Sequence, residues 1–166
     1  MKTKKMRSLY SQLTKTTKFL IREADSSELF LLDTHVWLWI VRGEHHRMQT
    51  GLMNYLDLLR RESKLQISVI SVWEVGILAA KNKIQLSKEY KDWIDHAIST
   101  SGVSVVGLTP EIAIESVRLP GEFHNDPADR FLVATARVLN ATLVTQDKQI
   151  LNYSRQGFLN SIPLSS

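Results

Sequence analysis

The chain has 166 residues, of which 21 are Lys or Arg and 17 are Asp or Glu, and it contains no cysteine. A chain of this length buries about two thirds of the surface that its unfolded form exposes, which suffices for one domain with a core of its own. The lack of cysteine excludes disulfides, iron–sulfur clusters, Cys-ligated zinc and thiol nucleophiles. Any metal ion must therefore be held by oxygen or histidine.

Two long apolar stretches occur, at residues 29–41 and 65–80, and Asp33 and Glu74 interrupt them. Neither stretch reaches the ~20 apolar residues of a membrane helix. The polar residues 8–18 exclude the apolar segment of a signal peptide. We expect a soluble, cytoplasmic protein with no membrane partner.

The positive charge is concentrated at the N-terminus. The formal net charge is +4, and residues 30–166 hold equal numbers of basic and acidic side chains. We interpret residues 1–28 as a basic extension before a domain at 29–166. It is either a disordered, solvated arm or a single helix, because apolar residues share one helical face at Met6, Leu9, Tyr10 and Leu13. A basic arm would add affinity for nucleic acid through phosphate contacts.

From residue 29 onward short apolar runs alternate with helix-period segments, which is typical of an α/β domain with a mainly parallel sheet. The expected elements, in chain order, are a strand at 29–33, helices at 35–41 and 49–61, a strand at 65–69, helices at 71–79 and 87–98, a strand at 103–106, helices from 109 and at 126–139, a strand at 142–145, a helix at 148–153 and an edge strand at 158–164. The sequence therefore predicts the α/β class.

Capping residues predict where several helices begin. Ser71 is expected to cap one helix, with Glu74 at its third position as in a capping box. Ser87 is expected to cap the next helix. Thr109 and Asp126 each precede a proline, which favours a cap followed by proline at the first helical position.

Acidic residues recur at the carboxyl ends of the predicted strands. Asp33 closes the first strand and Asp147 follows the strand at 142–145, while Glu74 and Asp129 lie early in two helices. Ligands of open parallel sheets bind at this edge. Four carboxylates so close together repel one another unless a cation compensates them, and Mg²⁺ or Mn²⁺ prefers such oxygen ligands. One or two such ions could activate water and stabilise the charge of a phosphodiester under attack.

Each acid also has a structural interpretation. Asp126 is best explained as a helix cap, and Asp129 and Glu74 would each favour a helix dipole. Asp147 could cap the helix at 148–153. Asp33 has no cap or turn to serve at the end of an apolar strand, so it gives the strongest functional signal.

Four ordered blocks resemble the PIN-domain ribonucleases, and among them the VapC-type toxins of toxin–antitoxin pairs. The blocks are LLDTHVWLW at 31–39, ISVISVWEVG at 67–76, HNDPADRFLVATA at 124–136 and LVTQDKQI at 143–150. In the family's pattern their acids match Asp33, Glu74, Asp129 and Asp147, with Asp126 and Thr145 as accessories. The resemblance covers about residues 29–155, and residues 1–28 have no counterpart in it.

The resemblance implies a three-layer α/β/α sandwich with a mainly parallel central sheet of four to five strands. It further implies a metal-dependent endoribonuclease, with one or two Mg²⁺ or Mn²⁺ ions held by the four matched acids and RNA as substrate. A cognate antitoxin would hold the enzyme inactive, and the enzyme would form a homodimer.

Other side chains leave alternatives open. Arg130 would hold phosphate or simply be a solvated helix charge, and Trp37 is the best candidate for an interface. A phosphotransferase using Asp33 as covalent nucleophile would need a second aspartate at position 35, where the chain has His35. The remaining alternative is a non-catalytic PIN-like module that binds an antitoxin-like partner or RNA.

Overall fold

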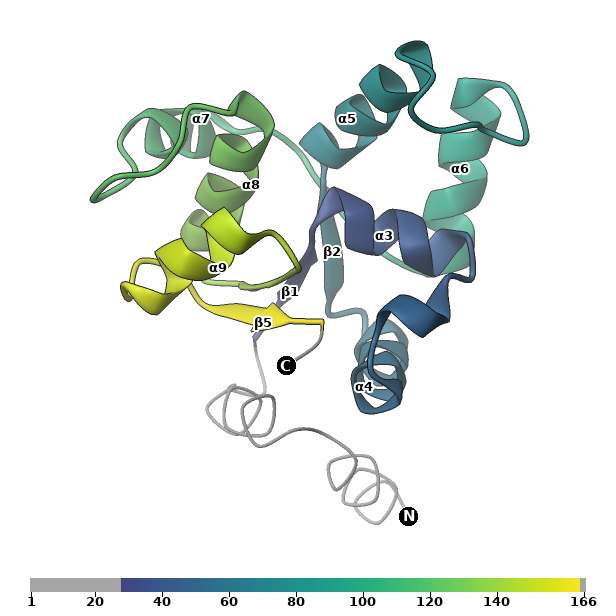
Figure 1. Cartoon of the computed structure of the whole chain (residues 1–166), viewed down its shortest axis with the longest axis horizontal. Coiled ribbons are helices and arrows are strands. Elements are labelled where there is room, and N and C mark those ends of the chain that lie inside the picture. The colour runs from purple at the N-terminus through teal and green to yellow at the C-terminus, as the bar shows by residue number, and fades with distance from the viewer. Residues whose placement is uncertain (1–27, 165–166) are drawn as a thin grey trace.

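The computed structural model describes residues 28–164 (Figure 1). The extension predicted at residues 1–28, apart from Glu28, lies outside the described residues. No helix within residues 28–164 is long and apolar enough to cross a membrane.

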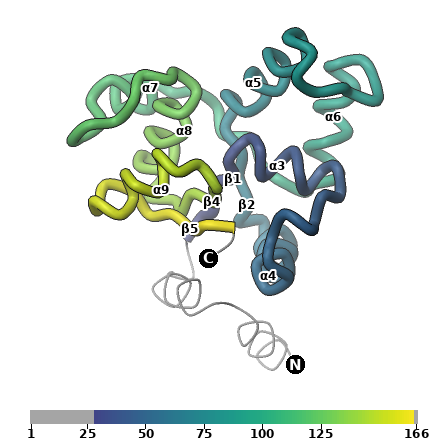
Figure 2. Tube along the Cα trace, viewed as in Figure 1, coloured from purple at the N-terminus to yellow at the C-terminus, as the bar shows by residue number. Residues whose placement is uncertain are grey.

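A central sheet organises the described part of the chain. Its five strands are β1 (Phe30–Leu32), β2 (Leu65–Ser68), β3 (Ser104–Val106), β4 (Thr142–Thr145) and β5 (Ser161–Pro163). They lie in the order β3-β2-β1-β4-β5, and all four pairings are parallel. Figure 2 labels β1, β2, β4 and β5 of this sheet at the centre of the molecule. β3 and β5 are therefore the edges, and the expected edge strand at 158–164 is confirmed as the shorter β5.

Helices cover both faces of this sheet. The α-helices are α3 (Thr34–Val41), α4 (Thr50–Arg61), α5 (Val69–Ala80), α6 (Tyr90–Ser101), α7 (Pro110–Val117), α8 (Pro127–Val138) and α9 (Lys148–Arg155), and His45–Arg47 form a short 3-10 helix. Figure 1 shows α3 to α6 gathered on one side of the strands and α7 to α9 on the other.

Side chains alternate across the strands and supply two hydrophobic cores. In β1, Phe30 and Leu32 pack with α3, α4, α5 and α6, whereas Leu31 packs with α7, α8 and α9. A strand buried on both faces in this way reads as a continuous apolar run. The predicted three-layer α/β/α sandwich is confirmed.

Two predicted helix starts are wrong. Ser68, not Ser71, caps α5, and its side chain accepts a hydrogen bond from the backbone of Ile70. β2 thus passes into α5 without a loop, and Glu74 falls beyond the first turn. Glu89 replaces Ser87 as the cap of α6, because its carboxylate accepts the N–H of Lys91 at 2.8 Å.

Trp37 does not form an interface. Its side chain is fully buried, its indole N–H donates to the hydroxyl of Ser101 at 3.0 Å, and its ring meets Trp93 edge to face. Trp37 instead lies on the face of α3 that packs against α6, in the hydrophobic core.

Candidate active site

The acids gather beside β1, the strand at which the strand order switches sides. β2 and β3 lie on one side of β1, and β4 and β5 lie on the other. β1 leads into α3 in one helical layer, and its neighbour β4 leads into α9 in the other layer. Such a switch point opens a crevice at the carboxyl ends of the two strands. Asp33 directly follows β1, and Asp147 comes two residues after the end of β4, so the topology places both at this edge of the sheet.

Asp33 ends β1 and also begins α3. Its carboxylate accepts the N–H of His35 at 3.2 Å, which makes it the N-cap of α3. The expectation that Asp33 has no cap to serve is therefore wrong, because the strand enters the helix without an intervening loop. Asp33 is only 8% exposed. Burial raises the pKa of its carboxyl, and the charge of Asp147 adds to that rise.

Thr145 connects the two strand-end acids. Its buried hydroxyl donates to Oδ2 of Asp33 and accepts the backbone N–H of Asp147 at 3.0 Å. Asp147 in turn caps α9, with Oδ1 accepting the N–H groups of Gln149 and Ile150 at 2.8 and 2.9 Å. The expected cap at Asp147 is confirmed, and the carboxylates of Asp33 and Asp147 are each fixed by hydrogen bonds.

Glu74 approaches the same place from α5. Burial raises the pKa of its carboxyl, the nearby Thr34 side chain opposes the rise, and the charge of Asp33 contributes to it. The Thr34 hydroxyl donates its hydrogen to the hydroxyl of Ser71 at 2.9 Å. The sequence pattern did not indicate Thr34 or Ser71 as residues of the site, although Ser71 lies three residues before Glu74 on one helical face.

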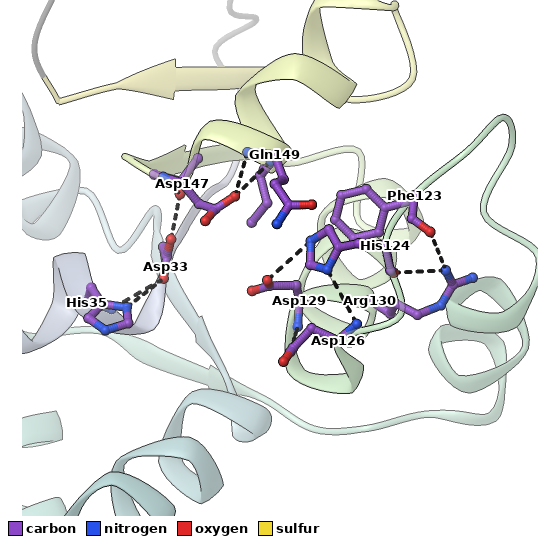
Figure 3. A network of polar contacts seen from close by, with 11 residues as sticks. Asp33, His35, Phe123, His124, Asp126, Asp129, Arg130, Asp147 and Gln149 are labelled. Atoms are coloured by element: carbon purple, nitrogen blue, oxygen red, sulfur yellow. Dashed lines mark hydrogen bonds and ion pairs between the residues drawn. The ribbon is translucent and has the colours of Figure 1, made fainter. Parts of the chain in front are cut away.

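Asp129 has a markedly raised pKa. Burial raises the pKa of Asp129 to about 7, with further contributions from the charges of Asp126, Asp33, Asp147 and Glu74. These contributions show that the predicted acids occupy one electrostatic environment. In Figure 3 the side chains of Asp33, Asp129 and Asp147 border a common space.

Asp126 and Arg130 have structural roles on either side of Asp129. Asp126 is exposed and caps α8, accepting the N–H of Asp129 at 3.2 Å, as expected for a residue before proline. The guanidinium of Arg130 donates to main-chain carbonyls of Ser116, Phe123 and His124 at 2.8 to 3.2 Å. These bonds hold the segment before α8, and a phosphate contact by Arg130 stays a prediction.

The donor chemistry of this cluster fits a hard divalent cation. Its side chains offer carboxylate oxygens, and their mutual repulsion is what a bound cation relieves. Among residues 28–164, no three His, Asp or Glu side chains form a ready-made cage for a metal ion. An open set of few protein ligands is the arrangement that Mg²⁺ commonly uses, with water and substrate phosphates completing its shell.

Sequence comparison identifies the family. A family model described as PIN domain matches residues 30–156. The chain belongs to the PIN-domain family. Ribonuclease VapC22 of Mycobacterium tuberculosis is 33% identical to this PIN domain over 123 residues, which cover 74% of this chain and 90% of that protein.

Two solved structures with a similar fold are of VapBC proteins bound to DNA. VapBC from Salmonella typhimurium, bound to DNA, matches this PIN domain with a TM-score of 0.60 and 16% identity, covering 82% of this chain and 98% of that one. VapBC2 from Rickettsia felis, bound to a promoter fragment, matches with a TM-score of 0.59 and 19% identity, covering 81% and 98%. At these identities the likeness shows the fold.

Proposed function

We propose that this protein is an endoribonuclease that depends on Mg²⁺ or Mn²⁺ and acts as the toxin of a toxin–antitoxin pair. The observation that carries the proposal is the gathering of acids at the β1–β4 switch point, where burial and the charges of the other acids raise the pKa of Asp129 to about 7. One or two ions would be held by Asp33, Glu74, Asp129 and Asp147. The similarity to a protein named Ribonuclease VapC22 supports RNA as the substrate.

A divalent cation would compensate the carboxylates, activate water and stabilise the charge that develops on the phosphate. The chain itself fixes the acids in place. Thr145 holds Asp33 toward Asp147, and the caps of α3 and α9 keep both carboxylates at the crevice. Because Asp129 retains its proton up to about pH 7, cation binding competes with that proton, and cation affinity rises with pH.

The partners follow from the same comparisons. Similar structures from Rickettsia felis and Salmonella typhimurium are VapBC complexes, which supports a cognate antitoxin for this chain. We further infer a homodimer, with cytoplasmic RNA as the target and residues 1–28 as a basic extension to the domain.

Cleavage of total cellular RNA by the purified, antitoxin-free protein tests the proposal. Discrete fragments are expected with Mg²⁺ or Mn²⁺, and none with EDTA. Asp33→Asn should abolish cleavage and leave the fold intact, because asparagine caps helices as well as aspartate does. Asp57→Asn is the matched control, since Asp57 lies on α4 and pairs with Arg60 and Arg61.

The outcomes separate the enzyme from its alternative. Metal-dependent fragments from the wild type and the Asp57 variant, but not from the Asp33 variant, would support the nuclease. Absence of cleavage by wild-type protein that is folded and loaded with metal would favour the non-catalytic module. Equal cleavage by the Asp33 variant would show that the nuclease activity belongs to a contaminant or to another site.

A further inference from the structure

His124 lies beside the acids but is not one of the four proposed ligands. It precedes α8 on the segment that Arg130 holds through the carbonyls of Phe123 and His124, both at 3.2 Å. The Phe123 ring packs against the imidazole, with centroids 4.3 Å apart, and also packs against Tyr153. The His124 ring is thus held in place by the hydrogen bond from Arg130 to the His124 carbonyl and by the Phe123 ring against one of its faces.

The hydrogen bonds of His124 determine where its proton lies. Nδ1 accepts the backbone N–H of Asp126 at 3.3 Å, so this nitrogen carries no hydrogen. A neutral imidazole then has its hydrogen on Nε2. A protonated Nε2 has no lone pair for a metal ion, so the geometry argues against His124 as a ligand and in favour of a donor.

Nε2 faces one acceptor. It lies 3.3 Å from Oδ2 of Asp129, as Figure 3 shows, yet it is buried and makes no well-aligned hydrogen bond. A buried donor left without a partner costs about 1–3 kcal/mol, so such groups call for an explanation. A small rotation of the Asp129 carboxylate would align its Oδ2 with this N–H.

We propose that His124 is a positioning residue that donates its Nε2–H to Oδ2 of Asp129 and thereby turns the other oxygen, Oδ1, toward the acid cluster. The inference rests on the proposed function, because Asp129 is there a ligand of a divalent cation. Carboxylates that bind metal are commonly oriented by such donors, and removing one costs about 10–100-fold in metal affinity.

Two amide substitutions separate the two nitrogens of the ring. In His124→Asn the side-chain oxygen can replace Nδ1 as acceptor for Asp126, but no donor reaches Asp129. In His124→Gln the amide nitrogen lies as far along the side chain as Nε2 and can donate to Asp129. His46→Asn serves as control, because His46 is exposed in the 3-10 helix.

The measurement is Mn²⁺ binding to the purified proteins by electron paramagnetic resonance or calorimetry at pH 8, with thermal unfolding of each variant alongside. The Asn variant should bind Mn²⁺ about 10–100-fold more weakly than wild type. The Gln variant should stay within a few-fold of wild type, and the His46 variant should not change. The reverse order, equal losses in both His124 variants, or no loss in either, would overturn the assignment.

A metal-free readout accompanies this test. Nitrogen-15 spectra of the imidazole at pH 8 should show the hydrogen on Nε2, and a hydrogen on Nδ1 would refute the proposal. Failure of the proposed function appears separately, as wild-type protein whose Mn²⁺ binding is absent or is unaffected by Asp33→Asn. That result would overturn the role of His124 in metal binding as well.

Discussion

Replacing Asp129 by asparagine should stabilise the metal-free protein at neutral pH. Asparagine keeps the shape of the side chain and can still accept a hydrogen bond from His124, but it carries no charge. Burial raises the pKa of Asp129 most, and the charges of four other acids raise it further. The substitution therefore removes a charge that the folded state disfavours.

The sign follows from the shift of this pKa. The carboxyl has an ordinary value of 3.8 and a folded value of about 7, so between these limits the folded state binds more protons. The free energy of unfolding falls as pH rises through that window, and the whole cost is present above about pH 7. A shift of this size corresponds to at most about 4 kcal/mol. The Asp129 side chain is 29% exposed, and solvent screens its interactions. We therefore expect Asp129→Asn to raise the free energy of unfolding by about 1–3 kcal/mol.

Thermal unfolding in EDTA between pH 4 and pH 8 measures this effect. The Asp129→Asn variant should match wild type near pH 4 and exceed it by about 2–10 °C in Tm at pH 8. Asp95→Asn, on the exposed surface of α6, should show no such pH-dependent difference. A difference in Tm that is constant with pH, or a variant less stable than wild type at pH 8, would refute the argument from charge repulsion.

Two further substitutions test the supports of the site. Thr145→Val removes the hydroxyl that connects Asp33 and Asp147 and keeps the side-chain volume, so RNA cleavage should slow about 10–100-fold. Thr145→Ser keeps the hydroxyl and should retain activity. Equal cleavage rates for the wild type and both variants would contradict this role of Thr145. Gly121→Ala should lower the free energy of unfolding by about 1–3 kcal/mol in denaturant titrations, because Gly121 has φ +68° and an added Cβ would lie 2.6 Å from the Phe158 ring. Gly157→Ala has a similar backbone strain at φ +86° without a close neighbour, so an equal loss there would exclude the contact as the cause.

The centre of the sheet could be predicted because β1 and β4 are buried on both faces. The runs at β1 and β4 are continuous and apolar, and each is followed by a helix signal, so their order along the chain was readable. The first residue of α5 could not be predicted from the sequence. Ser68 and Ser71 are both serines and could each cap a helix. Ser68 is the cap because the pairing of β2 with its neighbouring strands ends there and the helix begins at the next residue.

Asp33 and Asp147 were predicted at strand ends, and Glu74 and Asp129 early in two helices. The charges of the other three act on Asp129, and their role as metal ligands stays a prediction. Their local bonds were not predicted. The capping role of Asp33 depends on the direct passage from β1 to α3, which sequence pattern leaves uncertain by one or two residues. The approach of His124 to Asp129 depends on how Arg130 folds the preceding segment, and no local spacing encodes it.

The two edges of the sheet differ in how they would meet an additional strand. β5 ends at Pro163, which has no N–H to donate to a neighbouring backbone. β3 has no proline and leaves Val105 41% exposed, so its free backbone groups are open to pairing. Because β3 is only three residues long, such pairing would gain few hydrogen bonds. Both edge strands are therefore too short to pair extensively with an additional strand, and the proline of β5 limits pairing at that edge further.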